Sequence, residues 1–109
     1  MISDGEIQKA LDYLRDNADD AAQARANRIY MEEYRKSLKA RLKKESNASS
    51  NAAKEDDAYA HPDYLDHLAA IRAAVEADEK HRFMLSAAGA KIDAWRTQTS
   101  FNKSIGKLS

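Results

Sequence analysis

The sequence has no cysteine, one proline and three glycines among its 109 residues. The absence of cysteine excludes disulfides, thiolate metal sites and thiol catalysis. All-β sandwiches and barrels need many turn residues, so the scarcity of proline and glycine excludes them as well. No apolar run approaches the roughly 20 residues that cross a bilayer, and the opening MISDGEIQKA lacks a signal-peptide core. We therefore expect a cytoplasmic protein without membrane contact.

Large apolar side chains are also scarce. Leucine, isoleucine, valine and phenylalanine together number 17, whereas alanine alone numbers 21. A compact globule normally has more large apolar residues than this. Because alanine favours helices but adds little buried area, the composition predicts an almost wholly helical protein with a thin core.

Charge is abundant and is arranged in blocks. The 18 basic and 18 acidic residues cancel, but residues 1–24 carry a net −4, 25–54 a net +6, 55–79 a net −7 and 80–109 a net +5. One interpretation is that these blocks neutralise each other within the fold or within an oligomer. The other is that a basic block binds an anion.

The N-terminal residues predict a short helix of their own. Ser3 and Glu6 fit a capping box, and an apolar stripe of Ile7, Leu11 and Leu14 follows at helical spacing. Asn17 can end this helix, although an unbroken helix through this point stays possible. A second stripe then follows, composed of Ala24, Met31, Tyr34, Leu38 and Leu42.

The remaining pattern predicts a long antiparallel helical hairpin with helices at about 21–58 and 62–99. Pro62 suits the first turn of the second helix, and the turn would lie at 59–61. The alternative is a loop at 46–51, which no glycine or proline enforces. The apolar stripe expected for the second helix comprises Leu65, Leu68, Ile71, Val75, Leu85, Ile92 and Trp95.

We therefore expect an all-α, coiled-coil-like fold in which residues 1–109 form a single helical domain and 101–109 form a flexible tail. The contact stripe between the two helices is thin, so a third helix or another subunit should cover it, and we expect a homo-oligomer. Lys39 or Lys43 is expected to pair with Asp78 across the hairpin. Gly89, a costly residue inside a helix, indicates a close helix crossing.

Two segments have the composition of nucleic-acid sites. The first has six cations and no acid in ten residues, and its candidate phosphate contacts are Arg35, Lys36, Lys39, Lys43 and Lys44. The second mixes aromatic and basic residues, as sites that stack bases do, and its candidates are Trp95, Arg96 and Lys103. The alternatives are that the first is a solvated face paired with the acids at 76–79 and that Trp95 packs at the open end of the hairpin.

The histidines give no sign of a metal or catalytic site. His61 and His67 are six residues apart, and no pair of histidines has the i, i+4 spacing that places two ligands on one helix face. The sequence also has no glycine-rich phosphate loop and no nucleophile elbow. We expect no cofactor, no metal and no enzymatic activity.

The order of several short motifs resembles a family of small phage and prophage helical proteins, most of them uncharacterised. The motifs are Tyr34-Arg35-Lys36, Glu45-Ser46-Asn47, Ala58-Tyr59-Ala60, Glu76-Ala77-Asp78-Glu79-Lys80 and Ala94-Trp95-Arg96-Thr97-Gln98. The resemblance covers residues from about 28 to 104. Members of the family lie near phage recombination genes, so the resemblance implies an accessory role in DNA recombination within the bacterial host cell, by association alone. It implies no catalytic residue.

Together these observations predict a non-enzymatic phage accessory protein that binds single-stranded DNA, a recombinase or both through basic helix faces. The alternative is a protein-binding adaptor, structural or host-inhibiting, without affinity for nucleic acid.

Overall fold

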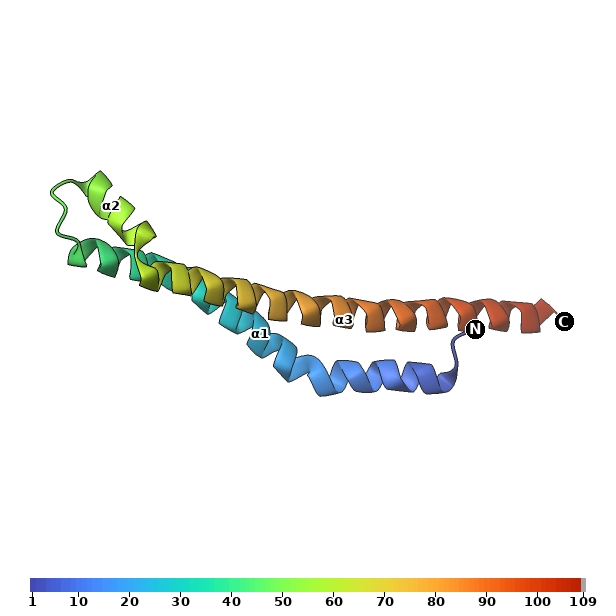
Figure 1. Ribbon diagram of the computed structural model, residues 1–109. Coiled ribbons are helices and arrows are strands. Elements are labelled where there is room, and N and C mark those ends of the chain that lie inside the picture. Colours follow the sequence, from blue (N-terminus) through green and yellow to red (C-terminus); the bar gives the residue numbers. More distant parts are fainter. Residues whose placement is uncertain (109) are drawn as a thin grey trace. The chain divides into compact units, whose positions relative to one another are not determined.

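A computed structural model describes residues 1–108 (Figure 1). Three helices account for nearly all of them: α1 spans Asp4–Glu45, α2 spans Asn51–Ala60 and α3 spans Pro62–Leu108. The described chain contains no strand, so the all-α prediction is confirmed. None of these helices combines the length and the apolar character needed to cross a membrane.

The separate N-terminal helix is a wrong prediction, because α1 runs unbroken from Asp4 to Glu45. The capping box does begin it, since the Ser3 hydroxyl accepts from the Glu6 amide at 3.1 Å. Asn17 does not end it. Its side-chain amide donates to the Tyr13 carbonyl at 3.0 Å, a contact within the helix that leaves the backbone pattern intact.

The chain reverses direction through residues 46–50, so the alternative of a loop at 46–51 holds and the predicted helix at 21–58 is wrong: α2 is a separate short helix. Ser50 caps α2, with its hydroxyl accepting from the Ala53 amide at 3.1 Å. The expected break near 59–61 also exists, but only as the single residue His61. His61 is extended, at φ −65° and ψ 136°, because the following Pro62 disfavours helical backbone before it.

Contacts divide the chain into two units. Unit 1 joins Met1–Ala21 to the residues from Lys80 onward, and unit 2 is Ala22–Glu79. In unit 1 the Ile2 amide donates to the Gln98 side chain at 3.4 Å, and in unit 2 Arg41 reaches Asp63 at 3.6 Å. In unit 2 Arg28 also reaches Asp78 at 3.1 Å, and in unit 1 Tyr13 and Met84 line one groove, so within each unit α1 and α3 run antiparallel. Residues 101–108, expected as a flexible tail, are the last turns of α3, and Ser109 lies outside the described residues.

Both long helices have a heptad pattern with alternating spacings of three and four residues, as in coiled coils. On α1 the positions are Ile7, Ala10, Leu14, Asn17, Ala21, Ala24, Arg28, Met31, Arg35, Leu38 and Leu42. On α3 they are Tyr64, His67, Ile71, Ala74, Asp78, His81, Leu85, Ala88, Ile92 and Trp95. All of these residues are buried or half-buried except Arg35.

This pattern corrects the predicted apolar stripes. Leu11, Leu65 and Leu68 lie off the heptad positions and are 45%, 53% and 38% exposed. Histidine, asparagine, arginine and aspartate occupy several heptad positions instead. The long aliphatic stems or short polar groups of these residues are compatible with half-burial between two narrow helices.

The packed centre of unit 2 is formed by Leu38, Leu42, Ala58 and Tyr64. Nearby, Tyr59 packs its ring edge to face against Tyr64, with ring centroids 5.2 Å apart. Among the described residues of unit 1 only Ile7, Ala10 and Ile92 are buried. Unit 1 is therefore the more thinly packed of the two.

Two further expectations are wrong. Asp78 pairs with Arg28 at 3.1 Å, and the same guanidinium reaches Glu79 at 3.0 Å, so neither Lys39 nor Lys43 takes this role. A methyl group built on Gly89 would meet no atom within 4 Å, so this glycine marks no close helix crossing within the described chain.

Candidate nucleic-acid interface

The cations predicted to contact phosphates lie on the last three turns of α1, in unit 2. Arg35, Lys36 and Lys44 are exposed, whereas Lys39 and Lys43 are half-buried. Three of the five, Arg35, Lys43 and Lys44, form no ion pair with any side chain in residues 1–108. The charge of Lys43 nevertheless acts on Glu55 and contributes to lowering the pKa of that carboxyl, so only Arg35 and Lys44 show no specific electrostatic partner among the described residues.

Lys36 has a partner but a weak one. Its ammonium lies 3.4 Å from the Glu33 carboxylate, one helical turn away, and both side chains are largely exposed. Exposed pairs of this kind contribute about 0–1 kcal/mol and are screened by salt. A polyanion can therefore compete with Glu33 for this lysine.

Lys39 is held by α2. Its ammonium forms an ion pair with the Glu55 carboxylate and lies 4.6 Å from the centroid of the Tyr59 ring. The hydrogen bond with Glu55, with a smaller contribution from Tyr59, raises the pKa of Lys39 above its ordinary range. The same contact, together with the charge of Lys39, lowers the pKa of Glu55. Of the five predicted cations, Lys39 is therefore the one committed to the fold.

The neighbouring turns of α1 carry two tyrosines that the sequence reasoning did not select as site residues. Tyr30 is 67% exposed and stacks on Tyr34, with ring centroids 6.1 Å apart and planes 13° apart. Tyr34 in turn contacts the edge of His67 at 5.3 Å. In the sequence, the sign of this stack is the i, i+4 spacing of the two tyrosines just before Arg35. Tyr34 belongs to the predicted apolar stripe, whereas Tyr30 does not.

The C-terminal candidates lie on α3 in unit 1, whereas the candidate cations of residues 35–44 belong to unit 2. Trp95 is half-buried at a heptad position, which agrees with the packing alternative rather than with a stacking platform. Arg96 lies 3.8 Å from Asp93 in an exposed pair within α3. Lys103 is exposed and forms no ion pair with a described side chain.

The histidines take structural contacts. The ring Nδ1 of His61 accepts from the Asp63 amide at 3.0 Å, and Nε2 of His67 lies 2.7 Å from the Met31 carbonyl. Nowhere in residues 1–108 do three histidine, aspartate or glutamate side chains gather in a way that could hold a metal ion.

Comparisons with protein families, with curated proteins and with solved structures found no match for this chain. The functional interpretation therefore depends on the side chains themselves. Without Lys39, which is paired with Glu55, the predicted phosphate contacts of α1 are Arg35, Lys36, Lys43 and Lys44, which we call the basic end of α1.

Proposed function

We propose that this protein is a non-enzymatic phage accessory protein for DNA recombination, which binds single-stranded DNA through the basic end of α1. The observation that carries the proposal is that Arg35, Lys43 and Lys44 have no ion-pair partner in the described chain. Phosphates would supply that partner and release their counterions on binding. The resemblance of residues 28–104 to phage proteins near recombination genes supports the recombination role and a location in the host cytoplasm.

The arrangement of the cations on the helix suits a strand running along α1. At about 100° per residue, Arg35, Lys39, Lys43 and Lys36 fall within about 100° of the helix circumference, and Lys44 lies about 80° beyond Lys36. Lys39 lies in the middle of this arc, where its pairing with Glu55 leaves it partly neutralised. The strand would therefore contact the cations on either side of Lys39.

The exposed ring of Tyr30 supports a single strand over a duplex. Single strands can place unstacked bases on aromatic rings, and each such contact is worth about 1–3 kcal/mol. Tyr30 lies little more than one turn before Arg35, and its stacking on Tyr34 holds the ring in place. Tyr30 lies about 140° around α1 from Arg35, outside the arc of Arg35, Lys39, Lys43 and Lys36, so a strand with a base on Tyr30 and phosphates on these cations would have to wrap around the helix.

The experiment is a titration of a fluorescent 20-nucleotide oligothymidine with the full chain and two triple variants. The test variant is Arg35→Gln, Lys43→Gln and Lys44→Gln. Its matched control, Arg25→Gln, Lys54→Gln and Arg72→Gln, removes the same charge from other positions of unit 2. Each phosphate contact contributes about 0.7 to the slope of log affinity against log salt, so the test variant should lower the slope by about 2. Equal slopes for the two variants would overturn the site.

A second candidate function is a protein-binding adaptor without affinity for nucleic acid. Two observations favour it: Lys39 is already paired with Glu55, and Trp95 is half-buried. The adaptor predicts no oligonucleotide binding even at low salt, whereas the DNA-binding proposal predicts binding that weakens as salt rises. A recombinase is one partner that either function could have.

A further inference from the structure

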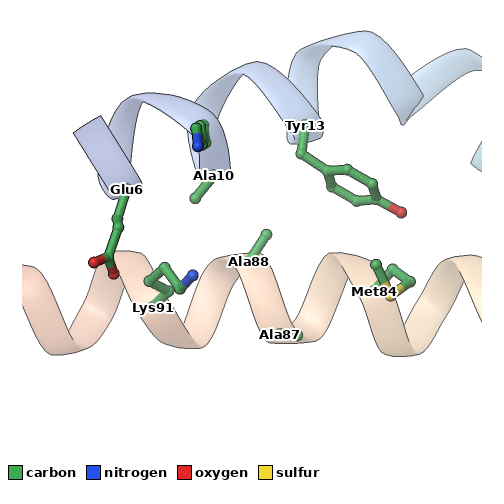
Figure 2. A pocket seen from close by; sticks show the side chains of 8 residues that line it. Glu6, Ala10, Tyr13, Met84, Ala87, Ala88 and Lys91 are labelled. Carbon is green, nitrogen blue, oxygen red and sulfur yellow. The ribbon is translucent and has the colours of Figure 1, made fainter. Parts of the chain in front are cut away.

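Unit 1 contains a groove between α1 and α3 that its own residues leave open (Figure 2). Its volume is about 390 Å³. The residues that line it are Glu6, Lys9, Ala10 and Tyr13 of α1 and Met84, Ala87, Ala88 and Lys91 of α3. Tyr13 and Met84 lie at one end, Ala10 and Ala88 approach each other in the middle, and Glu6 and Lys91 lie at the other end.

The groove is lined by alanines in its middle and has the charged side chains of Glu6 and Lys91 at one end. Alanine side chains in the middle allow another helix to approach closely, and Met84, which is 48% exposed, offers an adaptable apolar contact. Phe83, the residue before Met84 on α3, is 71% exposed. Such a surface between two antiparallel helices is suited to a further helix with an apolar face.

Unit 1 needs additional packing. Within its described residues only Ile7, Ala10 and Ile92 are buried, and the heptad positions between α1 and α3 include several alanines. Two narrow helices bury too little apolar surface to form an independent core, whereas four helices enclose one. The missing layer must therefore come from outside this pair of helices.

The charges of unit 1 indicate a second copy as the source of that layer. Residues 1–24 carry a net −4 and residues 80–109 a net +5. On α1, Glu6, Asp19 and Asp20 form no ion pair with a described side chain, and on α3 the same is true of Lys80 and Lys91. The unit thus places an acidic segment of α1 beside a basic segment of α3. Each segment has charged side chains that form no ion pair with a described side chain.

We propose that the groove is an interface with a second copy of this chain. Two copies pack unit 1 against unit 1 around a two-fold axis, with α1 of each beside α3 of the other. The interface is isologous, so each acidic α1 meets a basic α3 and both contacts form at once. Met84 and the groove alanines lie at the centre of the resulting four-helix bundle. This interface is separate from the basic end of α1, and neither proposal requires the other.

The first test measures mass by sedimentation equilibrium at protein concentrations from 1 to 100 µM. A chain of 12.2 kDa should give twice that mass. Ala87→Glu places a charge in the groove at an exposed position, so the helices of one copy can still pair, but dimerisation should weaken at least about tenfold. The matched control is Ala90→Glu, an exposed alanine of the same helix outside the groove, which should keep the dimer. A monomeric wild type, or equal effects of the two variants, would overturn the proposal.

The second test uses charge reversal and does not depend on the groove alanines. One variant carries Lys80→Glu and Lys91→Glu, and the other carries Glu6→Lys and Asp20→Lys. Each alone should dimerise more weakly than wild type, because like charges then face each other. Mixing the two should restore a dimer that contains one chain of each, since α1 and α3 are again complementary in both contacts. Mixing does not restore complementary charges within either chain, so only contacts between α1 of one chain and α3 of the other can produce the mixed dimer. Its absence would contradict the arrangement.

Discussion

The ammonium of Lys39 on α1 is paired with the carboxylate of Glu55 on α2 and lies over the ring of Tyr59. This contact joins two helices across the loop at 46–50, and the Tyr59 hydroxyl also reaches Glu55, at 3.4 Å. The pair gives Lys39, one of the predicted DNA contacts, a structural role. It also ties the stability of unit 2 to pH.

The sign of that pH dependence follows from the two shifts. The pKa of Glu55 is lowered, so its contribution is complete above the ordinary glutamate pKa of about 4.3 and is lost as the pH falls through the lower value in the fold. The pKa of Lys39 is raised, so its contribution is lost only as the pH rises far above 10. Urea unfolding should show wild type more stable than Glu55→Gln between pH 5 and 9, and this difference should disappear near pH 2. A difference that persists at pH 2 would contradict the pair.

Ser50→Ala should destabilise α2 by about 1 kcal/mol, because the Ser50 hydroxyl caps the Ala53 amide. Ser49→Ala is the matched control, since the Ser49 side chain makes no hydrogen bond within the described residues. Hydrogen exchange at the Ala53 amide measures the local effect, and urea unfolding measures the global one. Equal exchange rates in the two variants would show that α2 does not begin at Asn51.

Leu42→Ala should destabilise the protein by about 2–5 kcal/mol, because Leu42 is 2% exposed in the packed centre of unit 2. Leu65→Ala removes the same atoms from a side chain that is 53% exposed and should change stability by less than about 0.5 kcal/mol. Thermal and urea unfolding compare the two variants. A larger loss of stability in Leu65→Ala than in Leu42→Ala would mean that the apolar stripe predicted from the sequence, and not the heptad pattern, forms the packing face.

Gly89→Ala should raise stability by about 0.5–1 kcal/mol. The added methyl group meets no atom within 4 Å, and alanine loses less backbone entropy than glycine when a helix forms. Differential scanning calorimetry at matched protein concentration measures the change. A lower melting temperature would mean that a helix does approach this position closely.

The helical class and the start of α3 could be predicted because they depend on local chemistry. Alanine-rich composition favours helices, and Pro62 both fits a first helical turn and keeps His61 extended. The loop at 46–50 was harder to predict because it contains no glycine or proline. Its chain reversal depends on side chains: the Ser46 hydroxyl accepts from the Ala48 amide at 3.1 Å, and Ser50 caps α2.

The packing faces were only partly predictable because an apolar stripe is a poor guide in a chain with so few large side chains. Alanines, Asn17, Arg28, His67 and Asp78 occupy heptad positions, whereas Leu65 and Leu68 lie outside them. A search for spacings of three and four that admits polar residues would have found the pattern. The pair of Lys39 and Glu55 could not be inferred, since it requires α2 to fold back onto α1.

The candidate site could be predicted as a segment but not as a set of residues. Six cations in ten residues point to the last turns of α1 whatever the fold. Which of them lack an ion-pair partner depends on the rest of the chain: Lys39 pairs with Glu55, whereas Arg35, Lys43 and Lys44 form no ion pair with a described side chain. Of the two tyrosines before Arg35, only Tyr34 was placed in the apolar stripe, and its spacing alone does not distinguish a buried stripe from an exposed stack.

The most direct measurement is the affinity of the wild-type chain for fluorescent oligothymidine at 50 and 200 mM salt. Three to four phosphate contacts predict a slope of about −2 to −3 in log affinity against log salt, so affinity should fall by a factor of roughly 20–50 over this range. We expect binding at 50 mM that is micromolar or tighter. No binding at 50 mM, or binding that does not change with salt, would contradict a phosphate-binding role for the basic end of α1.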